Sequence, residues 1–206
     1  MRATLLINSL IFLCAVMFFS GCEKEPCLDI QELDKRSALT REWFVADSIG
    51  NRELSDSNGM SQTLMVKSRF TDSHDNMVED DCGNTYGSFY FAIQYNTSLS
   101  PLNFMVDIHG SGLEENGFYL KMTVTNTQTV DHKSTTYDFV SESARDDNAT
   151  VVIKEQVEIS GDEYHDVLEI TFTEAASPNG VRTVYYAKGH GIIKYITENG
   201  NEFEVT

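Results

Sequence analysis

Apolar and polar residues alternate with a period of two along much of this 206-residue chain. Between positions 102 and 109, for example, every second residue is apolar: Leu102, Phe104, Val106 and Ile108. Because successive side chains of a β-strand point to opposite faces, such a series places an apolar row on one face of a sheet. The same reasoning predicts strands over 42–46, 62–70, 86–95, 118–125, 135–140, 150–159, 168–173, 182–188, 191–197 and 202–205.

The segment 86–95 differs from the other expected strands because both of its faces are apolar or aromatic. Phe91 and Ile93 share one face, and Tyr90 and Ala92 share the other. This density predicts a strand that is covered on both sides.

Turn signals separate the expected strands: Asn-Gly pairs at 58–59, 116–117, 179–180 and 199–200, and Ser-Gly-Asp at 160–162. Glycine adopts the positive φ that tight hairpins require, and short links make neighbouring strands antiparallel.

The best helical pattern covers 29–36, where Asp29 is a candidate N-cap. The sequence therefore predicts an all-β fold with one short N-terminal helix. Its form is either an antiparallel sandwich or a strongly curved sheet that closes toward a half-barrel.

The first 21 residues have the features of a secretory leader. Arg2 supplies a positive charge, an apolar run follows over 5–19, and Gly21 precedes Cys22. This order resembles the lipobox of bacterial lipoproteins, which implies that Cys22 is acylated, with palmitate among its chains. A retained membrane helix is the alternative, but a spanning helix needs about 20 apolar residues and this run is shorter.

We therefore expect three parts: a signal peptide over 1–21, a lipid-anchored tether over 22–27 and a single β-rich domain over 28–206. The charged residues after Cys22 are similar to the short acidic export signals of surface lipoproteins in Bacteroidota. The expected location is the outer membrane of the cell envelope, with the domain on its periplasmic or its surface side.

The charge balance bears on the choice of partners. The chain has 32 acidic and 15 basic residues, for a formal net charge of −17. Nucleic acid binding relies on Lys and Arg that neutralise phosphates, so nucleic acid is not expected as a partner. A well-solvated surface is the simplest interpretation of the acidity, and an acidic site for cationic partners is the alternative.

Two of the four cysteines remain for a disulfide. Cys14 lies in the leader and Cys22 is expected to carry lipid, which leaves Cys27 and Cys82 in an oxidising compartment. A disulfide between them would close a long loop, and the chain-entropy model gives such a loop about 4 kcal/mol of stability. Two separate free thiols are the alternative.

The segment 185–194 reads Tyr-Tyr-Ala-Lys-Gly-His-Gly-Ile-Ile-Lys. Its Tyr-x-Ala-x-Gly-x-Gly-x-Ile-Lys pattern resembles the closing hairpin of β-rich envelope lipoproteins of Bacteroidota, and 164–172 resembles the strand before it. The resemblance implies an extracytoplasmic sheet protein, with the curved clamshell of lipoprotein carriers as one form, and implies no catalytic residues. We expect Gly189 and Gly191 to permit a tight or bulged turn; a phosphate-binding loop would need a helix after them.

The most polar window, 72–81, offers six candidate oxygen ligands for a cation: Asp72, Asp75, Asn76, Glu79, Asp80 and Asp81. It lacks the mid-loop glycine of an EF-hand, so a solvated loop is expected ahead of a calcium site. No two of the five histidines have helical ligand spacing, and Gly-x-Ser-x-Gly is absent. We therefore assign no metal site, no cofactor and no catalytic residue.

Aromatic residues are frequent in the expected strands, and strand spacing favours core and cross-strand pairs. A sugar-stacking platform or the lining of an apolar cavity is the alternative for Trp43, Phe44, Tyr86, Phe89, Tyr90, Phe91, Tyr95, Tyr185, Tyr186 and Tyr195.

The sequence thus predicts a lipid-anchored, non-enzymatic β-domain that binds an apolar molecule, a glycan or a protein in the envelope. A structural or assembly accessory subunit is the alternative, followed by an envelope hydrolase. An open concave face lined by apolar side chains would favour a lipid-like ligand, whereas a filled interior would favour protein partners.

Acylation can be tested in cells with radiolabelled palmitate. We expect Cys22→Ser to abolish the label and to move the protein out of the membrane fraction, because acyl chains supply the membrane affinity. Cys14→Ser is the matched control and should keep the label. Label that persists in Cys22→Ser would contradict the lipobox.

Overall fold

The computed structural model describes residues 27, 29–45, 50–72, 77–79, 82–111, 117–173 and 180–206. Their elements are α2 (Ile30–Arg41), β1 (Arg52–Asp56), β2 (Ser61–Asp72), β3 (Met77–Glu79), β4 (Thr85–Gly87), β5 (Phe89–Thr97), β6 (Leu102–Gly110), β7 (Phe118–Asn126), β8 (Asp131–Asp138), β9 (Ser143–Ala144), β10 (Ala149–Ile159), β11 (Asp162–Phe172), β12 (Val181–Ala187), β13 (Gly191–Thr197) and β14 (Glu202–Val205).

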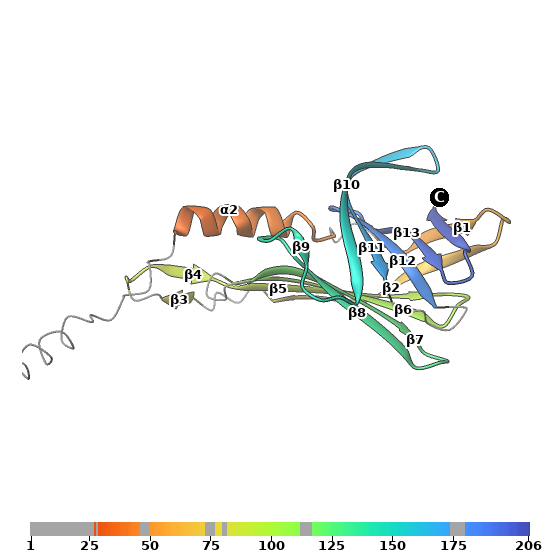
Figure 1. The fold of residues 1–206 in the computed structure, drawn as a ribbon, viewed down its shortest axis with the longest axis horizontal. Coiled ribbons are helices and arrows are strands. Elements are labelled where there is room, and N and C mark those ends of the chain that lie inside the picture. The colour runs from red at the N-terminus through yellow and green to blue at the C-terminus, as the bar shows by residue number, and fades with distance from the viewer. Residues whose placement is uncertain are drawn as a thin grey trace, which may run out of the picture.

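Twelve of the strands form one antiparallel sheet, in the order β10-β11-β12-β13-β14-β1-β2-β5-β6-β7-β8-β9. The chain starts in the middle of this sheet at β1, runs out to the β9 edge, crosses to β10 at the other edge and returns to β14, which pairs with β1. The sheet curls until it is nearly closed into a half-barrel (Figure 1). The predicted all-β class is confirmed, in its curved-sheet form.

Side chains of the protein itself fill the concave face of the sheet. Its largest fully buried residues come from strands all around the half-barrel: Leu54, Leu64, Phe89, Ile93, Leu102, Phe104, Ile108, Phe118, Leu120, Tyr137, Tyr186 and Tyr195. Trp43, Phe91 and Tyr95 belong to the same core. The core interpretation is therefore confirmed for Trp43, Phe89, Phe91, Tyr95, Tyr186 and Tyr195. Phe44, Tyr90 and Tyr185 are half-buried, and the side chain of Tyr86 lies outside the described part of the structure.

Helix α2 covers one end of the half-barrel (Figure 1), where it contacts β6 and β7. Its N-cap is Asp29, as predicted, and the carboxylate accepts from the backbone N–H groups of Gln31 (3.1 Å) and Glu32 (3.2 Å). The helix continues to Arg41, beyond the predicted end at 36. The Arg41 guanidinium lies 4.4 Å from the centre of the Phe89 ring at the start of β5, which places the helix at this end of the sheet.

The predicted strand over 42–46 is wrong for residues 42–45, which continue the helix as a turn. The backbone N–H groups of Trp43 and Phe44 donate to the carbonyls of Thr40 and Arg41. The Tyr186 hydroxyl then donates to the Trp43 carbonyl at 2.8 Å, so the turn docks on the core. Apolar residues here cap the end of the half-barrel and do not line a sheet; Ala46 lies outside the described residues.

The prediction that β5 is covered on both faces is also wrong. Its residues alternate between buried and half-exposed along the whole strand, so only one of its faces is fully buried. On the outer face the Tyr90 hydroxyl donates to the Asp107 carboxylate at 2.6 Å. Tyr90 is therefore an amphipathic surface residue that finds a hydrogen-bond partner outside the core.

Cys27 and Cys82 are paired as predicted, with their Cα atoms 5.8 Å apart. The pair ties the start of the described chain to the loop after β3. This is the end of the molecule at which α2 begins, on the left in Figure 1.

The turn predictions for Gly59, Gly161 and Gly200 are confirmed by positive φ values of 79°, 90° and 84°. Gly189 and Gly191 likewise form the tight β12–β13 turn, with φ values of 69° and 83°, and a strand follows. At Gly191 an added Cβ would lie 2.9 Å from both the Tyr95 hydroxyl and the Val45 side chain, so the core itself excludes a larger residue.

Gly191→Ala should therefore destabilise the protein by more than backbone strain alone. Gly161→Ala is the matched control, because its φ is also positive but nothing lies within 4 Å of the added carbon. We expect about 1–2 kcal/mol of strain in both variants and about 1–3 kcal/mol of overpacking in Gly191→Ala only. Urea unfolding measures both; equal losses would contradict the close packing at Gly191.

Candidate functional site

The end of the half-barrel opposite α2 carries the candidate site. Because α2 lies over the start of β5 and the end of β6, the opposite end is formed by the turn that joins these strands, 98–101, together with turns 57–60, 127–130 and 198–201. We call this end the mouth. Figure 1 shows it on the right, away from α2.

The mouth is hollowed by a cavity of about 290 Å³, which we call the mouth pocket. It is lined by Leu99, Ser100, Pro101, Leu102, Gln128, Tyr195, Thr197, Asn199, Asn201 and Phe203. The floor is buried and consists of Leu102, Tyr195, Thr197 and Phe203. The walls come from three separate turns and are more exposed, so the pocket combines an apolar floor with polar walls.

Hydrogen bonds fix the floor of the mouth pocket. The Gln62 side-chain amide donates through its nitrogen to the Tyr195 hydroxyl. Its side-chain oxygen, Oε1, accepts from the Ser100 hydroxyl at 3.3 Å. Burial raises the pKa of Tyr195 to about 12, although hydrogen bonds from Ser100 and Gln62 oppose the shift. The phenol therefore remains neutral at physiological pH.

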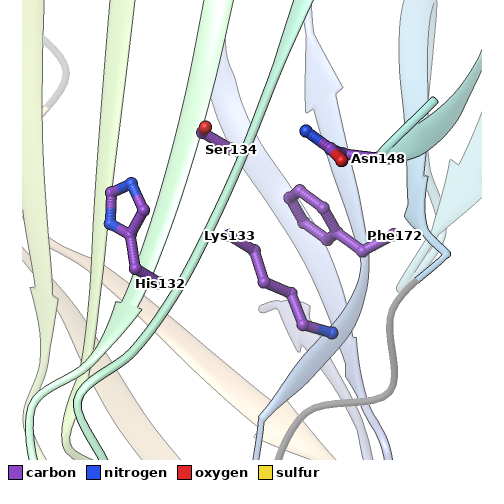
Figure 2. A pocket seen from close by; sticks show the side chains of 5 residues that line it. All are labelled: His132, Lys133, Ser134, Asn148 and Phe172. Carbon is purple, nitrogen blue, oxygen red and sulfur yellow. The ribbon is translucent and has the colours of Figure 1, made fainter. Parts of the chain in front are cut away.

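A second hollow lies at the seam, where the β8–β9 edge faces β10 and β11. This seam pocket, about 200 Å³, is lined by His132, Lys133, Ser134, Asn148 and Phe172 (Figure 2). A third, much narrower cavity lies nearby and borders Leu102 of the mouth pocket and Lys133 of the seam pocket.

Lys133 spans the mouth from β8 to the opposite wall. Its ammonium group donates to the Val181 carbonyl at 3.1 Å and to the Glu198 carboxylate at 2.8 Å. The side chains of Lys133 and Glu198 are largely buried, with exposed fractions of 10% and 16% respectively. Figure 2 shows the lysine reaching past Phe172, whose ring centre is 5.6 Å from the ammonium nitrogen. The ion pair thus closes a gap in the sheet that no strand ladder crosses.

The seam is also closed by the segment between β9 and β10. Asp146 accepts hydrogen bonds from the Thr135 hydroxyl (3.2 Å) and the Thr136 backbone N–H (3.3 Å). Arg145 pairs with the buried Asp138 carboxylate at 2.9 Å. These contacts fasten the segment that leads from β9 to β10 onto β8.

The residues predicted from sequence lie elsewhere. Cys22 and the leader fall outside the described residues, and the Cys27–Cys82 pair lies at the α2 end. In the acidic window, residues 73–76 and 80–81 are likewise outside. Across the described parts of the chain, no three His, Cys, Asp or Glu side chains are placed to hold a metal ion.

Sequence reasoning identified the turns of the mouth without recognising them as a site. Asn199 and Gly200 are assigned to a hairpin turn. Of the histidines in the described part of the chain, His132 is the one that lines the seam pocket. The ten lining residues of the mouth pocket are uncharged, but they come from separate turns, so this becomes visible only once the turns are known to meet.

Comparison of the chain with protein-family models, curated protein sequences and solved structures finds no match. Within the residues that the structure describes, no helix has the length and hydropathy that crossing a membrane requires.

The seam makes a quantitative prediction. Lys133→Met should destabilise the protein by about 3 kcal/mol, because it removes the ammonium group that pairs with the largely buried Glu198 carboxylate. Adding Glu198→Gln should recover part of the loss. Lys154→Met is the control. The Lys154 side chain is 44% exposed and its distance to Glu169 is longer, at 3.4 Å, so loss of this pair should cost less than about 1 kcal/mol. Equal losses of unfolding free energy in urea for Lys133→Met and Lys154→Met would contradict a stabilising role for the Lys133–Glu198 pair.

Proposed function

We propose that this protein is a lipid-anchored, non-enzymatic domain of the cell envelope that binds a small ligand at its mouth. The observation that carries the proposal is the contrast between a filled interior and a hollow mouth. Small-molecule sites are concave and combine apolar surface with a few placed polar groups, and the mouth pocket has this character.

The filled interior argues against a ligand enclosed by the sheet. Tyr186, Tyr195 and Phe104 occupy the concave face and are fully buried. Interiors packed in this way leave little room for a guest molecule. An apolar ligand held deep in the clamshell is therefore disfavoured, and the mouth becomes the preferred place for recognition.

The position of the anchor supports the same conclusion. The proposed lipidation site, Cys22, precedes Cys27 by a few residues, and Cys27 is tied to the α2 end of the half-barrel. The mouth lies at the other end of the molecule (Figure 1). An acylated Cys22 would thus leave the mouth directed away from the membrane surface.

The chemistry of the mouth pocket supports binding ahead of catalysis. Its one titratable lining residue is Tyr195, whose raised pKa keeps the phenol protonated. General acid or base catalysis relies on groups that exchange protons near neutral pH. The lining supplies hydrogen bonds and apolar contact instead.

A second candidate function, an accessory subunit that adds to a partner's sheet, is favoured by the edge strand β10. This strand lies at the end of the sheet order, and Val152 and Ile153 are 41% and 42% exposed. Ile153 stands opposite the fully buried Leu168, so the core reaches solvent at this edge. An exposed edge with apolar residues can accept a strand from another chain.

Hydrogen–deuterium exchange of the full chain in detergent separates these two functions. The probes are two fractions of a cell-envelope extract from the source organism: a small-molecule fraction that includes the released glycans, and a macromolecular fraction that contains the proteins. We expect the small-molecule fraction to slow exchange in turns 98–101, 127–130 and 198–201 several-fold, and Gln128→Trp, which fills the pocket, to abolish the effect.

Slowing confined to β10 and caused by the macromolecular fraction would replace the proposal with the accessory function. An unchanged exchange pattern with both fractions would reject ligand binding at the mouth.

A further inference from the structure

We infer that the ligand of the mouth pocket is an uncharged sugar presented on a glycan. The inference rests on the proposed function, because it names the ligand class of the same site. Three features of the pocket carry it: its lack of charge, its apolar floor and its unused amide groups.

The mouth pocket is uncharged in a strongly charged protein. Charged residues make up 23% of the chain, yet none of the ten lining residues carries a charge. Moving a charged ligand group out of water requires a counter-charge, which this lining does not offer. A carboxylate, a phosphate or an ammonium group is therefore a poor fit, and a neutral ligand is a good one.

The arrangement of the lining matches the two surfaces of a sugar ring. A pyranose presents C–H groups on its faces and hydroxyl groups around its edge. Leu102 and Phe203 form an apolar floor, and Leu99, 67% exposed, extends it to the rim. The hydrogen-bonding groups around this floor come from Ser100, Gln128, Asn199 and Asn201, and Thr197 adds a hydroxyl within the floor.

Two of the amides are not used by the fold. In the β7–β8 turn the Asn126 carboxamide oxygen accepts from the backbone N–H groups of Gln128 and Thr129, which leaves the Gln128 side chain outside the turn's hydrogen bonds. In the β13–β14 turn the Thr197 hydroxyl donates to the Asn199 side chain at 2.5 Å, and Asn201 takes part through its backbone.

The side chains of Gln128 and Asn201 thus line the pocket with free donors and acceptors. An amide both donates and accepts, as a sugar hydroxyl does, so each amide can satisfy a hydroxyl in either role. A purely apolar ligand would instead cover these groups and leave them without water.

The size of the mouth pocket favours a small ligand group. At about 290 Å³ the mouth pocket is at the small end of ligand sites, which span roughly 300–1,000 Å³. Because its rim is exposed at Leu99, a sugar seated in the pocket can remain attached to a glycan that extends into solvent.

Affinity gel electrophoresis of the full chain in detergent tests the inference. The neutral probes are starch, mannan, xylan, dextran and the neutral glycans released from the envelope of the source organism; polygalacturonate is the anionic comparison. We expect at least one neutral glycan to retard the protein and polygalacturonate to have no effect.

Removal of the two free amides should weaken this retardation. Each lost hydrogen bond to a neutral ligand corresponds to about a 2- to 10-fold loss of affinity, so Gln128→Leu with Asn201→Leu should lose about 10-fold or more. Gln156→Leu is the matched control, because Gln156 is an exposed amide on β10 far from the mouth, and it should bind like the unchanged protein.

Three outcomes would overturn the sugar assignment: no neutral glycan retards the protein, only polygalacturonate does, or the double variant binds as well as the control. If exchange in the mouth turns still slows with the small-molecule extract in those cases, the ligand-binding function stands and only the ligand class fails. If that slowing is also absent, both fail together.

Discussion

The pairing of β1 with β14 is the constraint on which the rest of the structure depends. Without it the twelve-stranded sheet would separate into one half that runs from β1 through β2 and β5 to β9 and another that contains β10–β14, since every other neighbouring pair lies within one half. The junction rests on three residue pairs, among them Leu54 with Val205 and Asp56 with Phe203. It brings together the first and last strands of the sheet, so its loop-closure entropy is large, and packing beneath it must compensate.

That compensation comes from the aromatic side chains on the concave face. The Tyr195 ring centre lies 5.4 Å from that of Phe104 and 5.0 Å from that of Phe203, which links β6, β13 and β14 across the interior. The same packing excludes a guest from the interior. The interactions that hold the two halves together therefore also restrict recognition to the ends of the half-barrel, and α2 already covers one of them.

The sequence predicted most strands because burial of one face imposes a clear alternation. β13 and β14 were predicted at their observed bounds, although the adjacent Ile192 and Ile193 of β13 are both buried and interrupt that alternation. β1 was missed, because Leu54 is the only apolar residue in Arg-Glu-Leu-Ser-Asp and a single residue has no period. The strand predicted around Trp43 and Phe44 was wrong because adjacent apolar residues are also found in a turn that follows a helix.

The candidate site could not be predicted from the sequence, for a different physical reason. Its lining comes from turns that are far apart along the chain and meet only because the strands between them share one sheet. Hairpin chemistry also explains one polar residue of the lining without any ligand, because the Asn199 side chain serves its own turn. Gln128 and Asn201 line the same pocket, and among the hydrogen bonds of the described residues their side chains serve neither turn. A role in recognition therefore falls on these two amides first, because their side chains can bond to a ligand without breaking a turn.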